Sequence, residues 1–283
     1  MHDRVLVTGA GGYVGRHVVR ALLDRGHEVI ATVRPGSRSD VDARATVVAV
    51  DLLDPAFDVR TLADTPVDGV VHLAWQDGFA HNATSHMLQL SDHFRLLEAF
   101  TDWGVKRLAV LGTMHEVGYW EGAIDADTPT NPLSLYGIAK DALRKASFVH
   151  LAPRVPLQWL RCYYILGDDL NNQSIFTRIL KAAEEGKDTF PFTTGRNKYD
   201  FIDVAELGDQ IAAVSARADI TGIINCSSGV PMTLADRVEA FIVENNLPLS
   251  LEYGAFPDRP YDSPGVWGDA TQILAVMEEA SKA

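Results

Sequence analysis

A tyrosine and a lysine four residues apart form the pair around which this 283-residue sequence is organised. In the segment YGIAK at 136–140, Tyr136 and Lys140 would lie on one face of a helix, one turn from each other. An ammonium group beside a phenol favours the phenolate, so Lys140 is expected to lower the pKa of Tyr136 from its ordinary value of about 10. Such a phenol can take a proton from an alcohol, or return one to an alkoxide, near neutral pH. The same spacing also occurs on exposed helix faces without a catalytic role, so other segments of the chain are needed to show whether this pair is catalytic.

A glycine-rich turn near the N-terminus predicts a dinucleotide site. Residues 4–8 (RVLVT) have the pattern of a buried parallel strand, a helix is expected over 13–25, and a second strand over 28–33. Glycines in such a turn permit a tight bend, a close approach to a pyrophosphate, and close packing of the helix. The N–H groups that begin the helix would face the phosphates. A glycine-rich turn can also occur without a ligand, but the flanking strand and helix favour cofactor binding, and the expected contacts are Gly9, Gly12, Tyr13, Val14 and Gly15.

The end of the second strand indicates which cofactor is used. An acidic residue there would bind the ribose 2′-hydroxyl of NAD, but the chain has no carboxylate before Asp40. Instead, Arg34, Ser37 and Arg38 offer two positive charges and a hydroxyl, which suit a 2′-phosphate. NADP(H) is therefore favoured and NAD(H) is the alternative, although an ordinary solvated basic loop would have the same composition.

The remaining pattern predicts an α/β fold, a Rossmann-like doubly wound parallel sheet with a smaller C-terminal substrate-binding lobe. Residues 1–163 are expected to form the NADP-binding domain, with contributions from later segments. Residues 164–283 are expected to form the lobe, interleaved with that domain, because strands shorten and polar loops lengthen there. Ligands bind beyond the carboxyl ends of the strands in such sheets, so Thr113, just after a strand, should face the site. His72, inside a strand, is interpreted as a core histidine.

The charge of the chain limits its partners. Lysine and arginine total 25 against 38 aspartate and glutamate residues, which gives a net charge of −13 and a pI near 5.0. This argues against nucleic acid or an anionic membrane as a partner. No apolar run reaches membrane-spanning length, and a strand that starts at Arg4 leaves no room for a signal peptide, so a cytoplasmic protein is expected. Cys162 and Cys226 lack metal-ligand spacing and are expected to be small buried side chains, so no metal site is predicted.

Taken together and in order, several segments resemble the extended short-chain dehydrogenase/reductase family, in its nucleotide-sugar epimerase/dehydratase/reductase branch. The likeness spans nearly the whole chain. The matching residues are TGAGGYVG at 8–15, Asp51 and Leu52, His72 to Ala74, Gly112 and Thr113, PLSLYGIAK at 132–140, Arg161, Asp200 to Ile202, and Arg259 and Pro260.

The resemblance implies a catalytic role for Thr113, Tyr136 and Lys140. Tyr136 would be the acid/base, Lys140 would hold the ribose and tune the phenol, and Thr113 would bind the reacting oxygen. Further cofactor contacts are implied at the strand ends, at Asp51, Leu52, Leu73, Ala74 and Trp75. Substrate contacts are implied at Thr113, Met114, His115, Tyr164, Arg196, Tyr199 and Arg259, with Arg259 at the diphosphate of a nucleotide sugar.

Departures from the family pattern narrow the range of reactions that this chain is expected to catalyse. The 4,6-dehydratases of the branch carry an Asp-Glu pair directly after the threonine, where this chain has Met114 and His115. Elimination of water across C5–C6 needs an acid and a base, so a dehydratase is disfavoured. Tyr164 and Tyr199 replace an Asn and an Arg of the relatives, which requires rearranged diphosphate contacts.

Three functions are therefore open. The favoured one is an NADPH-dependent reductase of a nucleotide-diphosphate-linked 4-keto-6-deoxy sugar, with Tyr136 as proton donor. The alternatives are a nucleotide-sugar 4-epimerase with tightly bound NAD, and a non-enzymatic dinucleotide sensor, which would not need the acid/base pair. The family also implies a homodimer, in which the helices expected over 83–103 and 134–150 pair between subunits.

Overall fold

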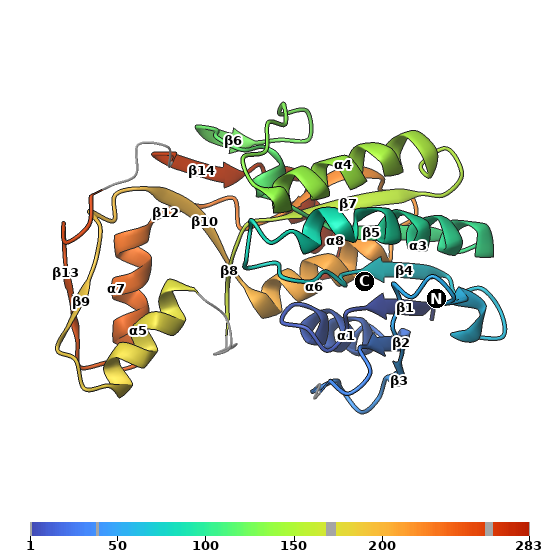
Figure 1. The fold of residues 1–283 in the computed structure, drawn as a ribbon, viewed down its shortest axis with the longest axis horizontal. Helices are drawn as coiled ribbons and strands as arrows, with labels where there is room; N and C mark the ends of the chain where they lie inside the picture. The colour runs from blue at the N-terminus through green and yellow to red at the C-terminus, as the bar shows by residue number, and fades with distance from the viewer. Residues whose placement is uncertain (1, 38–39, 168–173, 258–262, 283) are drawn as a thin grey trace.

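A parallel sheet of seven strands forms the centre of the larger part of the protein (Figure 1). The computed structural model describes residues 2–37, 40–167, 174–257 and 263–282. The strand order is β11 (Gly222–Cys226), β7 (Leu157–Cys162), β5 (Arg107–Thr113), β4 (Gly69–His72), β1 (Arg4–Thr8), β2 (Glu28–Val33) and β3 (Thr46–Ala49). The order reverses between β4 and β1, and an open sheet of this kind binds ligands beyond its carboxyl edge at that point. The expected doubly wound α/β fold is confirmed.

Helices cover both faces of this sheet because its strands alternate apolar side chains between two cores. On β1, Val5 and Val7 face one core while Leu6 faces the other. The first core is completed by α1 (Gly15–Asp24), α6 (Val204–Ser215) and α8 (Thr271–Ala280), and the second by α3 (Leu90–Trp103) and α4 (Leu135–His150).

The helix expected over 83–103 is divided in two. A short helix, α2 (Ser85–Leu88), precedes α3, and Gln89 lies between them. His86 on α2 is buried, and its ring accepts a hydrogen bond from Trp75 Nε1 at 3.0 Å and bonds the Ala80 carbonyl at 3.0 Å. Gly104, in the left-handed conformation, ends α3 as the sequence predicts.

A smaller lobe is built from short strands and two helices. One sheet has the order β12 (Pro231–Thr233), β10 (Lys198–Asp203), β14 (Gly265–Gly268) and β6 (Gly122–Ile124), with β8 (Tyr164–Leu166) paired to β10. A separate strand pair, β9 (Thr189–Pro191) and β13 (Ser250–Glu252), packs with α5 (Ile175–Glu184) and α7 (Leu234–Glu244) around Phe190, Phe192 and Val238. The arrowheads of β1 and β4 point toward the side on which α5 and α7 lie (Figure 1).

Segments from both halves of the chain cross between the two parts. Strand β6 precedes residue 164 yet pairs in the smaller sheet, while β11, α6 and α8 follow that residue yet complete the larger one. The buried Asp200 ties the parts together, because its carboxylate accepts hydrogen bonds from Ser228, Gly229 and Gly268 at 2.7–3.1 Å. A domain boundary at residue 163 stays a prediction.

Candidate active site

Among Gly9, Gly12 and Gly15 of the turn between β1 and α1, one glycine leaves room for a ligand. A Cβ atom on Gly9 would lie 2.7 Å from the Ala74 backbone nitrogen, and one on Gly15 would lie 2.2 Å from the Gly9 carbonyl oxygen. These two glycines are therefore required by the packing of the turn itself. Gly12 is exposed, and a Cβ there would meet only the Gly9 carbonyl oxygen, at 3.1 Å. The bare surface at Gly12 fits the close approach of a pyrophosphate to the backbone.

The edge of the sheet next to this turn is held by a buried hydroxyl. Thr8 Oγ1 accepts hydrogen bonds from the backbone N–H groups of Leu73 and Ala74 at 3.1 and 3.2 Å, and it lies 2.8 Å from His72 Nδ1. His72 Nε2 lies 3.0 Å from His93 Nδ1, and burial holds the pKa of His72 well below its usual value. The interpretation of His72 as a satisfied core histidine is confirmed.

Thr113 and Tyr136 meet beyond the carboxyl end of β5. Thr113 is the last residue of β5, and Tyr136 lies in the first turn of α4, whose N-terminus is capped by Ser134 through a 3.2 Å hydrogen bond from the Gly137 N–H. A hydrogen bond joins the side chains of Thr113 and Tyr136 and lowers the pKa of the phenol. Burial outweighs it and raises the pKa of Tyr136 above its ordinary value.

Lys140 lies one turn further along α4 and is also buried. Its ammonium donates a 2.7 Å hydrogen bond to the Leu111 carbonyl and lies 3.9 Å from the centre of the Trp75 ring. Burial lowers the pKa of Lys140 to about 8. Burial is the largest influence on both groups and raises the pKa of Tyr136, so the tuning of the phenol by Lys140 stays a prediction.

Histidines surround the phenol ring in a way that the sequence did not reveal. The His81 ring stacks on Tyr136 with a 5.5 Å centroid separation and an interplanar angle of 15°, and the His86 ring lies 5.2 Å away. The His81 backbone carbonyl also accepts a 2.9 Å hydrogen bond from the Tyr136 N–H. His81 and His86 come from a loop and a short helix with no recognisable spacing, so only the count of nine histidines hinted at such a group.

The two residues in place of the dehydratase carboxylates have different environments. Met114 is buried against Val117, Ile124 and other apolar side chains. The His115 ring lies 4.3 Å from His81 and 6.0 Å from Tyr136, so it does reach the site. Burial, with a smaller effect of His81, lowers the pKa of His115 to about 4, so this ring is neutral near pH 7.

The other predicted residues lie around this centre or in the lobe. Tyr164 and Tyr199 bring their rings within 4.3 Å of each other on neighbouring strands, and Arg196 is exposed before β10. Asp51 is exposed and accepts a hydrogen bond from the Leu53 N–H, while Leu52 is buried. Arg34 and Ser37 are exposed, and the Ser37 hydroxyl donates to the Arg34 carbonyl at 2.7 Å. Arg38 and Arg259 lie outside the described residues.

The described part of the chain contains no candidate metal site and no candidate membrane span. No group of three or more His, Cys, Asp or Glu side chains there is arranged to hold a metal ion. Within the same ranges, no helix has the length and apolar character needed to cross a bilayer. Cys162 and Cys226 are free and buried, as predicted.

Residues 5–227 match the NAD dependent epimerase/dehydratase family. The chain belongs to this family. The expected family and enzyme class are thereby confirmed: the protein is an oxidoreductase of the extended short-chain type that works with a nicotinamide dinucleotide.

Within this family, the chain is 43% identical over 278 residues to a dTDP-6-deoxy-L-talose 4-dehydrogenase (NAD(+)) from Aggregatibacter actinomycetemcomitans, with 93% of this chain and 98% of that protein covered. It is 26% identical over 230 residues to a UDP-glucose 4-epimerase from Lactobacillus helveticus, with 73% of this chain and 70% of that protein covered.

Solved structures of family members share the fold. A UDP-N-acetylglucosamine 4-epimerase from Methanobrevibacter ruminantium M1 superposes with a TM-score of 0.82 at 20% identity, covering 97% of this chain and 92% of that chain. A UDP-glucose-4-epimerase from Stenotrophomonas maltophila with bound NAD gives a TM-score of 0.84 at 17% identity, covering 98% and 93%. The arrangement of sheet and lobe is therefore the one expected for this family.

Proposed function

We propose that this protein is a nucleotide-sugar 4-dehydrogenase, which interconverts a dTDP-linked 6-deoxyhexose and its 4-keto form with NAD(H). The similarity to the dTDP-6-deoxy-L-talose 4-dehydrogenase carries this proposal, because it extends over 98% of that relative at 43% identity. Run toward the alcohol, this reaction is the 4-ketoreduction that the sequence favours. The 4-epimerase alternative has support from relatives at 26% identity.

In the proposed mechanism, Tyr136 moves the proton and Thr113 positions the oxygen. When the sugar is oxidised, Tyr136 acts as the phenolate that takes the proton of the C4 hydroxyl, while the Thr113 hydroxyl bonds the same oxygen. Forming this phenolate requires the positive charge of Lys140 to offset the burial that raises the pKa of the phenol in the free protein. When the ketone is reduced, the phenol returns that proton to the developing alkoxide. The nicotinamide, when bound, accepts or supplies the hydride at C4. Lys140 supplies the positive charge near this centre, and His115, with a pKa of about 4, is neutral.

The groups beside the catalytic pair support chemistry at C4 without dehydration. Met114 and His115 replace the two carboxylates that elimination requires, and neither offers an ionised acid at neutral pH. Glu116 does not replace them, since it is fully buried behind Thr113 and bonded to the Thr113 backbone N–H and the Trp159 indole. The site therefore lacks the acid and base pair of a 4,6-dehydratase.

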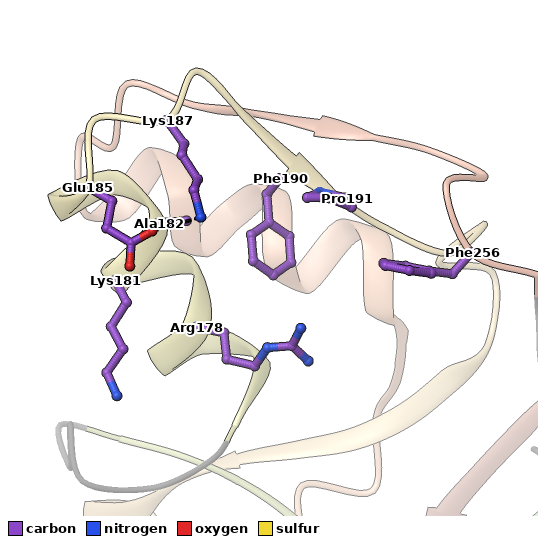
Figure 2. Close-up of a pocket in the computed structure, with 8 residues that line it drawn as sticks. All are labelled: Arg178, Lys181, Ala182, Glu185, Lys187, Phe190, Pro191 and Phe256. Carbon is purple, nitrogen blue, oxygen red and sulfur yellow. Dashed lines mark ion pairs between the residues drawn. The ribbon is translucent and has the colours of Figure 1, made fainter.

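A pocket of about 300 Å³ in the lobe suits the nucleotide part of such a substrate (Figure 2). Its lining joins the aromatic rings of Phe190 and Phe256 with the positive side chains of Arg178, Lys181 and Lys187, and Lys187 is paired with the lining residue Glu185 at 2.7 Å. Figure 2 shows the Arg178 side chain extending from α5 toward the space between Phe190 and Phe256. Aromatic rings can stack on a base and a guanidinium can bond phosphate oxygens, so we assign the nucleoside diphosphate to this pocket.

The cofactor is proposed to be NAD(H). The most similar of the relatives described above is named for NAD(+), which does not favour the NADP(H) preference drawn from Arg34, Ser37 and Arg38. Among the described residues of that loop, Arg34 is exposed and the Ser37 hydroxyl is used as a donor within the turn. An exposed arginine in this position is compatible with both cofactors.

A homodimer through α2 and α4 is proposed as well. Leu88 on α2 is 75% exposed and Val149 on α4 is 81% exposed, while Met87 and Ile138 on the same helices are also exposed. Exposed apolar groups on neighbouring helices suit a self-complementary interface with two-fold symmetry. Light scattering at micromolar concentration should give about twice the single-chain mass of 30.9 kDa, and the single-chain mass would contradict the dimer.

The test of the function is a turnover assay on purified protein. We expect dTDP-6-deoxy-L-talose to reduce NAD, followed by absorbance of the reduced nicotinamide, with a 4-keto product identified by mass spectrometry. UDP-glucose is the matched control for the epimerase alternative. Production of UDP-galactose from it, without net cofactor turnover, would replace the proposed function with epimerisation.

A further inference from the structure

Glu116 lies directly behind the catalytic threonine, and the proposed mechanism does not use it. It belongs to a short helical turn, Met114–Glu116, that follows β5, and its side chain is fully buried. One carboxylate oxygen, Oε1, accepts the Thr113 backbone N–H at 2.8 Å and the Trp159 indole N–H at 2.8 Å. Thr113 Oγ1 in turn accepts the His115 N–H at 3.3 Å. The turn is thus closed by a reciprocal pair of side-chain-to-backbone bonds that fixes the Thr113 backbone.

Two arginines neutralise Glu116 from the other side. Arg144 Nε on α4 lies 3.3 Å from Glu116 Oε2, and Arg161 Nη2 on β7 lies 3.6 Å from the same oxygen. Arg144 is also paired with Asp141, at 2.6 Å. Asp141 is paired with Lys145 as well, at 2.7 Å, so the cluster holds three cations against two carboxylates, and a buried guanidinium such as that of Arg161 needs a paired anion. We therefore assign the ionised form to Glu116 near neutral pH.

The backbone before Thr113 is shaped around this network. A Cβ atom on Gly112 would lie 2.1 Å from Trp159 Nε1 and 2.8 Å from Glu116 Oε1. Only glycine at this position lets the indole and the carboxylate approach each other. The strand end that delivers Thr113 to the site is therefore built to accommodate Glu116.

The network is not optimised for stability alone. Glu116 Oε2, Arg144 Nε, and Arg161 Nε and Nη2 are buried without a hydrogen-bond partner, although they lie in one ionic cluster. Buried ion pairs with incomplete hydrogen bonding contribute little to stability and are often matched by apolar packing. Departures of this kind from full polar satisfaction are expected where a site has a function.

We propose that Glu116 is a positioning residue for the sugar reaction, with two separable effects. Its carboxylate geometry fixes the Thr113 backbone next to Tyr136, and its negative charge acts through the protein interior on Tyr136 and Lys140. The proposal rests on the proposed function for its catalytic meaning, but both effects are properties of the free protein.

The charged groups around Glu116 support the proposed effect of its negative charge on Tyr136 and Lys140. Burial is the largest influence on the pKa of Tyr136 and of Lys140, and the Glu116 charge raises both. Burial also raises the pKa of Glu116 itself, while Arg161, the hydrogen bonds named above and Arg144 act in the opposite direction and favour its ionised form. Arg144 and Arg161 face Glu116, and Cys162 of β7 faces Lys140. Lys140 titrates at about 8, so removal of the negative charge should shift this titration to a lower pH.

Two variants separate charge from geometry. Glu116→Gln removes the charge but keeps an oxygen that can accept the Thr113 N–H, so the Lys140 midpoint should fall below its wild-type value while the Thr113 amide stays protected. Glu116→Asp keeps the charge but withdraws the acceptor by one methylene. In that variant the Lys140 midpoint should stay, while exchange of the Thr113 amide should accelerate on the order of tenfold.

Both readouts are NMR measurements that need no substrate. Lysine Cε signals are followed through a pH titration, with Lys140→Met to assign the Lys140 signal, and amide exchange is followed at Thr113. Glu184→Gln, on the exposed side of α5, is the control for a general loss of charge. An unchanged Lys140 midpoint in folded Glu116→Gln, or unchanged Thr113 protection in Glu116→Asp, would overturn the proposal.

With two variants, the role of Glu116 can be decided even if one variant does not fold or the proposed substrate is wrong. If Glu116→Gln does not fold, Glu116→Asp alone decides whether the carboxylate positions Thr113. If wild type does not oxidise dTDP-6-deoxy-L-talose, the proposed function fails while the two NMR results still decide the role of Glu116. Where wild type is active, both variants should have a lower kcat with little change in KM.

Discussion

The catalytic edge of the sheet and the nucleotide pocket of the lobe are built in opposite ways. At the edge, Thr113 and Lys140 are buried, they are attached to long elements of the main sheet, and their neighbours shift pKa values. In the lobe, Arg178 lies on the ten-residue helix α5 and Phe256 lies in a loop, where it is 50% exposed. One region fixes where a proton moves, while the other offers charge and aromatic surface.

The difference indicates which substitutions should change the catalytic rate and which should change the affinity for the substrate. Groups that act on a proton must be placed to within a fraction of an ångström, which buried backbone provides. Side chains that bind a base or a phosphate at the surface can adopt several conformations, and one such residue can be replaced by another with a smaller loss of function. We therefore expect kcat to follow the sheet edge and KM to follow the lobe pocket.

The largest effect is expected for Tyr136→Phe, which tests the catalytic edge. The substitution deletes the phenol hydroxyl but keeps the ring that stacks with His81. General acid–base catalysis contributes about 10²–10⁴-fold, so kcat should fall by that order while cofactor affinity stays unchanged. Near-wild-type turnover on a substrate that the enzyme oxidises would exclude Tyr136 as the base, and His115, which lies next to His81, would then be the group to test.

The two regions also differ in how much of them the sequence revealed. Gly9, Tyr136 and Lys140 stand in short motifs with fixed spacing, because a turn or a single helix sets their geometry. The His81 stack and the Glu116 network join segments that only the tertiary fold brings together, so no local spacing announces them. Burial decides the pKa of Tyr136, and burial cannot be judged from a pair of residues on one helix.

The lobe was less predictable for a different reason. Its strands are three to six residues long, and β13 pairs with β9 across about sixty residues of chain. Such pairing depends on tertiary context more than on local propensity. Its helices are easier to predict, because α5 and α7 have clear amphipathic periods and Ser174 and Thr233 as N-caps.

Lys140→Met should separate stability from activity at the catalytic edge. The pKa of Lys140 is lowered from 10.5 to about 8 by burial, so at pH 7 the folded state carries a costly buried ammonium. Methionine should raise the free energy of unfolding at pH 7 by on the order of 1–3 kcal/mol, although it loses the Leu111 hydrogen bond, while activity is lost.

The sign of the pH dependence follows from the same shift. Between pH 8 and 10.5 the unfolded chain binds more protons at Lys140 than the folded protein does, so this residue makes wild-type stability rise with pH in that window. The variant lacks this contribution, so its advantage should shrink as pH rises. Urea unfolding at pH 7 and pH 9.5 measures both, and an advantage that grows with pH would contradict the assigned cause.

Arg178→Ala tests the lobe side of the comparison. If Arg178 bonds a phosphate of the substrate, its loss should raise KM for the nucleotide sugar on the order of tenfold, with kcat within about twofold of wild type. Glu184→Gln, on the same helix but outside the pocket lining, should leave both constants unchanged. A fall in kcat without a change in KM would show that the two regions do not divide rate and affinity as argued.

Arg34→Ala should have the smallest effect and tests the exposed loop next to the glycine turn. With NAD, the exposed Arg34 side chain has no 2′-phosphate to bind, so affinity should change by less than about twofold. With NADP, a charge-assisted bond would be lost and affinity should fall several-fold, which lowers the NADP/NAD affinity ratio. Fluorescence titration of both cofactors against wild type and variant measures the ratio. An unchanged ratio would show that Arg34 does not contact the 2′ position of the ribose. Discrimination between NAD and NADP would then come from other side chains around the ribose, because an exposed side chain without a fixed partner cannot supply that discrimination.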